Sequence, residues 1–233
     1  LEAQRKLAEG LVTSGRLTEA APMLLALAER AARPSRAEQL RREAGEHYMI
    51  SGELERGLQV LQPLLMAAQL VYPEREAVAR QQHSEAFARL ARRGIVWVER
   101  SELELSSGEL ARHDLYWSLC KGHMLNDIVR GGLFAAQSAA LALELGEPRR
   151  ICRSLAVAGA VGLERGDEEG RRWLNEADRI AQKIGDRHAS ALVAICWALV
   201  RRGRGEWAQA LADLEFGLYL EVSLGRAKQR FRW

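Results

Sequence analysis

The side chains best suited to chemistry gather in one stretch of the sequence, where Cys120 and His123 follow His113. A thiolate and two imidazoles are zinc ligands, but they must converge around the ion, and this spacing matches no common zinc pattern. His113, Trp117, Cys120 and Met124 recur at intervals of three and four, which is typical of one buried helix face. We therefore predict no metal ion and no cofactor here.

The sequence also lacks the motifs that mark common enzyme classes. It has no phosphate-binding loop of the Gly-x4-Gly-Lys-Ser/Thr type, no His-Arg-Asp kinase loop, no Gly-x-Ser-x-Gly elbow and no His-Glu-x-x-His pair. We predict that this chain is not an enzyme and that it acts by binding.

Charge and cysteine content narrow the binding partners and the compartment. The net charge is +3, and acidic and basic residues alternate along the chain, whereas nucleic-acid binding needs a one-sided basic stripe. The longest uncharged run, residues 57–73, is interrupted by glutamine and proline, so we predict no membrane span. The cysteines, Cys120, Cys152 and Cys196, are odd in number and lie in apolar stretches, which predicts buried free thiols in the cytoplasm.

The start of the chain repeats itself. Residues 5–27 align with residues 42–64 at a constant offset of 37 and without a gap. The identical pairs are Arg5/Arg42, Glu9/Glu46, Ser14/Ser51, Gly15/Gly52, Leu17/Leu54, Leu24/Leu61 and Leu27/Leu64. A period of this length indicates stacked supersecondary units, because one unit cannot bury its own apolar face.

Almost every segment has the apolar spacing of a helix, and glycine marks the turns. Ser35–Glu38 and Ser106–Glu109 have the capping-box pattern of helix starts, and Gly131-Gly132 predicts a turn. Residues 74–109 are the least regular part, with a helix to residue 93 and then a helix turn or a strand at 94–98. The helices are predicted at residues 4–14, 17–30, 36–50, 54–70, 74–93, 110–130, 133–145, 149–165, 168–184, 187–202 and 206–224.

The spacing of small and apolar residues around two of these turns resembles the tetratricopeptide hairpin. The pattern is a small residue, an apolar one three later, glycine four after that and a small residue five later. It fits Ala8, Leu11, Gly15 and Ala20, and again Gly45, Tyr48, Gly52 and Gly57. The resemblance implies an all-α, right-handed α-α superhelix of about five to six helical hairpins. It would span residues 1–233 as a single solenoid, which we expect to be part of a larger protein.

The middle of the chain resembles the helical C-terminal region of large bacterial serine/threonine protein kinases. The matching strings are LYWS at residues 115–118, DIVRG at 127–131, and AALAL, GEP and RSLA between residues 139 and 156. In those proteins a kinase domain precedes a signal-transducing ATPase module and a tetratricopeptide-like tail. The resemblance implies a multidomain signalling protein whose catalytic parts lie outside this chain.

In tetratricopeptide arrays the first helix of each pair lines a concave groove. The repeat phase gives six groove candidates: Arg5, Glu9, Val12, Arg42, Glu46 and Met49. Glu9 and Glu46 stand where some family members carry an asparagine that helps clamp a terminal carboxylate. They would repel an acidic C-terminal peptide, so a mixed-charge or basic-apolar segment fits better.

Four further residues are candidates for contacts with a neighbouring domain: Trp97, Asp127, Arg130 and Trp233. For Asp127 and Arg130, a local ion pair at a helix end is the favoured alternative, because such pairs are common on helix surfaces.

These observations predict a protein–protein interaction scaffold that serves as the regulatory region of a signalling protein. Its partner would be a protein segment, a neighbouring domain of the parent chain or a second copy. The alternative is a small-molecule sensor that gates a parent ATPase or kinase, with an apolar pocket near residues 74–105.

Overall fold

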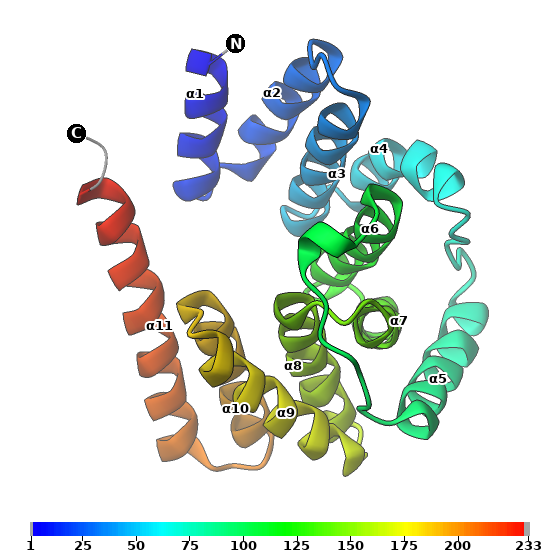
Figure 1. Ribbon diagram of the computed structural model, residues 1–233, viewed down its shortest axis with the longest axis vertical. Coiled ribbons are helices and arrows are strands. Elements are labelled where there is room, and N and C mark those ends of the chain that lie inside the picture. Colours follow the sequence, from blue (N-terminus) through cyan, green and yellow to red (C-terminus); the bar gives the residue numbers. More distant parts are fainter. Residues whose placement is uncertain (1, 231–233) are drawn as a thin grey trace. The chain divides into compact units, whose positions relative to one another are not determined.

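The protein is described here by a computed structural model of residues 2–230, with side chains placed for residues 2–219. Within that range it has eleven α-helices and one short 3-10 helix, and no strand is assigned (Figure 1). The helices pack in sequential pairs, which is consistent with a helical repeat. The all-α prediction is confirmed.

The contacts within the chain divide it into two compact units. The first comprises residues 1–85 and 105–134, and the second comprises residues 86–104 and 135–233. Two helices, α5 (Glu76–Arg93) and α7 (Ile128–Leu145), contribute residues to both units.

The first unit is built around α3. Its helices are α1 (Glu2–Thr13), α2 (Leu17–Glu29), α3 (Pro34–Ile50), α4 (Leu54–Ala67) and α6 (Ser107–His123). Helix α2 packs on both α1 and α3, and α3 also packs on α4 and on α6 (Figure 1). Helix α3 is thus the helix that organises this unit.

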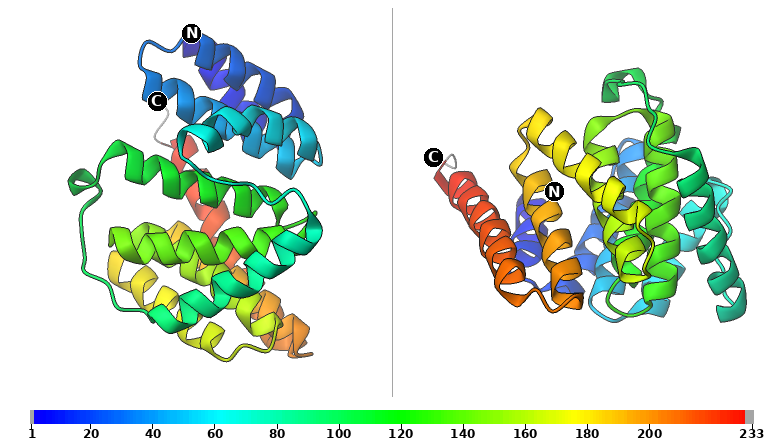
Figure 2. Two further views of the ribbon diagram at one scale, coloured as in Figure 1. Left: turned by 90° about the vertical axis from the view of Figure 1, so that its right-hand side faces the viewer. Right: turned by 90° about the horizontal axis from the view of Figure 1, so that it is seen from below.

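The second unit contains two further hairpins. Its elements are η1 (Glu102–Glu104), α8 (Pro148–Glu164), α9 (Glu169–Ile184), α10 (Arg187–Gly203) and α11 (Trp207–Arg230). Helix α8 pairs with α9 and α10 with α11, and α10 also packs on α8 and α9 (Figure 2).

The predicted repeat at an offset of 37 forms two hairpins with the same turn. At Gly52, whose φ is +92°, the Gly52 N–H bonds to the Met49 carbonyl at 3.1 Å and the Glu53 N–H bonds to the Tyr48 carbonyl at 2.9 Å. This is the Schellman arrangement, which satisfies the last carbonyls of a helix and favours glycine because φ is positive. The turns at Gly15, Gly166 and Gly205 have the same bonds and positive φ.

Close approach of two helices within a hairpin depends on small residues. A Cβ atom on Gly57 of α4 would lie 2.6 Å from the backbone oxygen of Gly45 on α3, and it would also overlap the Met49 side chain. The α8–α9 pair repeats the arrangement, because a Cβ atom on Gly170 would lie 2.6 Å from the Gly159 oxygen. These distances leave no room for a methyl group, so the backbones are in direct contact.

The predicted turn at Gly131-Gly132 is wrong, because both glycines lie inside α7. The chain breaks earlier, where the Asp127 carboxylate accepts the Arg130 N–H at 3.0 Å and starts α7. A Cβ atom on Gly131 would lie 3.1 Å from the Met124 Cα, so this glycine serves close packing and not chain reversal.

Of the two predicted capping boxes, one is confirmed and one is wrong. The Ser106 hydroxyl accepts the Glu109 N–H at 3.2 Å, and the Glu109 carboxylate accepts the Ser106 N–H at 2.9 Å. Helix α3 instead follows Arg33, with Pro34 in its first turn and no side-chain cap. Proline favours this position because its fixed φ suits a helix start, so Ser35 lies inside the helix.

Neither alternative for residues 94–98 is correct, since this stretch is an extended chain without helix or strand (Figure 2). It is held by scattered contacts within the second unit. The Arg100 N–H bonds to the Gly146 carbonyl at 2.9 Å, and the Trp97 ring N–H bonds to Glu176 at 3.3 Å.

Among the described residues, one helix is long and apolar enough to cross a membrane on those criteria alone, and it is α7. In the structure 61% of that stretch is buried inside the protein, as is common for a core helix.

A pair of glycine substitutions tests the close approach of α3 and α4. Gly57→Ala should lower the free energy of unfolding by about 1–3 kcal/mol, because a methyl group has no space there. Gly10→Ala in α1 should raise it by about 0.5–1 kcal/mol, because alanine favours helices and no heavy atom lies within 4 Å of the new methyl group.

Urea denaturation followed by circular dichroism measures both effects. Stabilisation by both substitutions would contradict the close backbone contact.

Candidate functional site

A hollow of about 360 Å³ lies in the first unit, between α1, the end of α2 and the start of α3. We call it the arginine hollow. Its lining residues are Glu2, Arg5, Leu27, Arg30, Ala31, Arg36 and Leu40. Leu27 and Leu40 belong to the core cluster and line the hollow with the small part of each residue that stays exposed, 7% and 4%, beside three guanidinium groups.

Two of these three guanidinium groups bond to neutral amides. Arg30 lies 3.5 Å from the Gln4 side-chain oxygen, and Arg36 donates to the Gln39 side-chain oxygen at 2.7 Å. Within the part of the chain that the structure describes, neither forms an ion pair with a carboxylate. The hollow therefore combines apolar side chains and the carboxylate of Glu2 with two guanidinium groups that are not paired with a carboxylate of the described residues. Guanidinium groups and apolar side chains are suited to binding a protein segment.

Of the three groove candidates on α1, Arg5 lines this hollow and Glu9 and Val12 do not. Arg5 lines the hollow and pairs with Glu9 at 3.3 Å, and both side chains are about half exposed. Val12 is partly buried near the end of α1.

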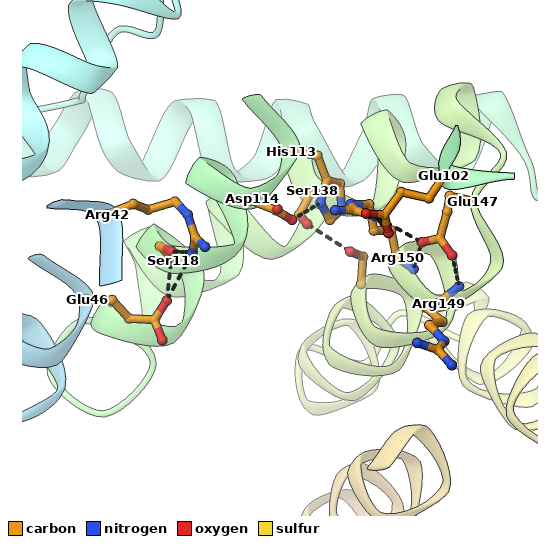
Figure 3. A network of polar contacts seen from close by, with 11 residues as sticks. Arg42, Glu46, Glu102, His113, Asp114, Ser118, Ser138, Glu147, Arg149 and Arg150 are labelled. Atoms are coloured by element: carbon orange, nitrogen blue, oxygen red, sulfur yellow. Dashed lines mark hydrogen bonds and ion pairs between the residues drawn. The ribbon is translucent and has the colours of Figure 1, made fainter. Parts of the chain in front are cut away.

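The three groove candidates on α3 do not lie on an open face, because α6 covers them. The Glu46 side chain is 8% exposed and accepts a hydrogen bond from the Ser118 hydroxyl at 2.7 Å (Figure 3). Arg42 donates to the same hydroxyl at 2.7 Å, and the Lys121 ammonium forms an ion pair with Glu46. Met49 is fully buried. The expected exposure of Arg42, Glu46 and Met49 is thus wrong.

Asp127 and Arg130 form the expected local ion pair, but it lies at the N-terminal start of α7 and not at the C-terminal end of a helix. Arg130 also donates to the carbonyls of Pro73 and Glu74, at 2.9 and 2.5 Å. The pair therefore fixes the connection that leads into α5, within the first unit.

Of the two tryptophans proposed as domain contacts, the structure describes only Trp97. Trp97 is partly buried and bonds to Glu176 within the second unit. Trp233 lies outside the described residues.

A charged cluster in the second unit escaped sequence analysis. Arg150, buried at 8% exposure, pairs with Glu147 at 3.3 Å and with Glu102 at 3.0 Å (Figure 3). The Glu147 carboxylate also accepts the N–H of Arg150 at 2.8 Å and so caps α8. The sequence does carry a signal for the cap of α8, because an acidic residue directly precedes Pro148. Acidic residues and proline both favour the start of a helix.

The residues first considered for chemistry, Cys120, His113 and His123, are buried. Burial raises the pKa of the Cys120 and Cys152 thiols to about 12, so neither is a thiolate at neutral pH. All three cysteines are buried and free, as predicted. In the described range, no group of three or more histidine, cysteine or acidic residues is placed to hold a metal ion.

His123 belongs to an aromatic cluster in the first unit. Its Nε2 lies 3.0 Å from the Tyr72 hydroxyl, and its ring stacks on Phe134 with centroids 5.9 Å apart. Burial lowers the pKa of His123 to about 4, so the ring is neutral at pH 7.

No protein-family model, curated protein or solved structure matches this chain.

Acidification should destabilise the protein through His123. Its pKa is about 4 when folded, against about 6.5 when unfolded. Between these values the unfolded state binds more protons, so stability should fall as the pH drops from 6.5 to 4. The expected slope approaches about 1.4 kcal/mol per pH unit.

Thermal melting across this pH range measures the slope for the wild type and for His123→Gln, which should flatten it. Burial lowers the pKa of His47 as well, so part of the slope should persist. His188→Gln, at an exposed position, is the matched control. An equal slope in the His123 variant would contradict the assignment.

Proposed function

We propose that this chain is a non-catalytic protein-interaction scaffold that binds a segment of a partner protein at the arginine hollow. The observation that carries the proposal is the pairing of two guanidinium groups, Arg30 and Arg36, with the apolar surface of Leu27 and Leu40. The neutral state of the buried Cys120 supports a role without catalysis.

The chemistry of the hollow selects its partner. Guanidinium groups bind carboxylates through paired hydrogen bonds, and the exposed edges of Leu27 and Leu40 can contact an apolar side chain. Sequence reasoning favoured a mixed-charge or basic-apolar segment because it placed Glu9 and Glu46 in the groove. Glu46 is buried beside cationic groups and does not face a partner. We therefore favour a mixed-charge segment that sets acidic residues beside an apolar one.

The helical framework suits a scaffold. Helices α1, α2 and α3 hold most of the lining residues on regular backbone, and Arg30 and Ala31 directly follow α2, so little conformational entropy is lost when a segment binds. We further propose a tetratricopeptide-like superhelix that regulates a larger bacterial signalling protein in the cytoplasm, as the kinase-tail resemblance implies. Its proposed partners are proteins, not nucleic acid or a membrane.

A small-molecule sensor is the second candidate function. The volume of the hollow, about 360 Å³, falls in the range of small-ligand sites. Such a ligand would bind between α1 and α3, not near residues 74–105 where the sequence suggested a pocket.

An array of random peptides tests the proposed function. Peptides that bind the chain should combine aspartate or glutamate with leucine, isoleucine, phenylalanine or methionine. The double substitution Arg30→Ala/Arg36→Ala should weaken their binding about tenfold or more, since losing about 1.4 kcal/mol corresponds to tenfold. Fluorescence anisotropy on the selected peptides gives the affinities.

Arg80→Ala is the matched control, because it removes an exposed guanidinium in the first unit outside the hollow. Selection of basic peptides, or equal affinity for the double variant, would overturn the proposal. A melting shift with a metabolite and none with any peptide would favour the sensor.

A further inference from the structure

Helix α11 carries an apolar stripe on its surface. Trp207, Leu211, Leu214 and Leu218 recur at intervals of four, three and four, so they share one side of the helix. They are 67%, 58%, 39% and 59% exposed. We call these four residues the α11 stripe. An exposed row of large apolar side chains marks a surface for protein contact.

The register of α11 can be compared with that of α2, because both follow the same turn. Ala20 comes five residues after the turn glycine Gly15, and Ala210 comes five residues after Gly205. Both alanines are buried, at 0% and 4% exposure, as expected where each helix crosses its hairpin partner.

This register equates Leu211, Leu214 and Leu218 of α11 with Ala21, Leu24 and Ala28 of α2. In α2 the three positions are buried, at 0%, 6% and 2% exposure. They form one core cluster with α3, to which Ala37, Leu40 and Ala44 contribute. The side of α2 that packs on the next hairpin therefore corresponds to the exposed side of α11.

Helix α1 shows the opposite half of the same contact. The offset of 37 equates Leu40 and Ala44 of α3 with Ala3 and Leu7 of α1. Both α3 residues are buried in the cluster with α2, whereas Ala3 is exposed and Leu7 is 56% exposed. Helix α1 thus exposes the side with which α3 packs on α2.

We propose that this face of α1, formed by Ala3 and Leu7, binds the α11 stripe of a second copy of the chain. The contact would reproduce the α2–α3 packing between molecules and extend the stack of hairpins head to tail. It does not involve the binding chemistry of the arginine hollow.

Side-chain size supports this pairing. Helix α11 has Leu211 and Leu218 where α2 has alanine, and α1 has Ala3 where α3 has Leu40. Ala3 therefore leaves room for a large residue of α11, as in packed layers that interdigitate, while Leu7 adds apolar surface where α3 has Ala44. A second copy is the favoured occupant because one chain carries both halves of the contact in its own repeat register.

The contact is heterologous, meaning that different faces of the two copies meet. Sedimentation at increasing protein concentration should show the wild-type mass rising above the 26.0 kDa of one chain. Leu7→Glu removes the α1 face, and Leu211→Glu/Leu214→Glu removes the stripe. Each variant alone should stay at the mass of one chain.

Mixing the two variants should restore a species of twice that mass and nothing larger, because each supplies the face that the other lacks. Phe216→Glu is the matched control, since Phe216 is 53% exposed on α11 but lies outside the stripe by helical periodicity. It should associate as the wild type does. Circular dichroism checks that every variant keeps its helix content.

A wild-type mass that stays at one chain at every concentration would overturn the inference. Association by Leu7→Glu at the wild-type level would also overturn it, because it would indicate pairing of two α11 stripes.

Discussion

The direct contact of backbones within a hairpin is the constraint on which the rest of the structure depends. Gly45 and Gly57 bring α3 and α4 so close that no methyl group fits between them, and Gly159 and Gly170 do the same for α8 and α9. Because glycine has no side chain, the larger apolar residues near these crossings point to other sides of each helix. Those sides pack on the neighbouring hairpin, which explains why helices stack in sequence order.

The polar contacts then determine which faces are closed. Helix α6 covers α3 through Glu46, whose charge is offset by Lys121 and Arg42 and whose oxygens are hydrogen-bonded. Burying a carboxylate is costly unless it is paired in this way. This contact fills the surface expected to be a groove. The proposed binding surfaces are those that packing leaves free, the arginine hollow beside α1 and the stripe on α11.

Local features of the sequence were sufficient to predict the hairpins. The offset of 37 and the turn glycines place α1 to α4 correctly, because Schellman turns depend on neighbouring residues alone. The errors involve distant contacts. Gly131 is needed for packing on Met124 and not for a turn, and Lys121 reaches Glu46 across 75 residues. Of the guanidinium groups in the hollow, only that of Arg5 was predicted, because the others come from helix ends that meet through tertiary packing.

Hydrogen exchange resolved for each helix would test the central claim, that hairpins stack through close contacts and leave the outer helices covered on one side only. Helices α3 and α8 pack on several neighbours, whereas α1 packs on α2 and α11 packs on α10. At low protein concentration we expect the slowest exchange in α3 and α8 and the fastest exchange in α1 and α11. Exchange in α11 as slow as in α8 under those conditions would contradict it.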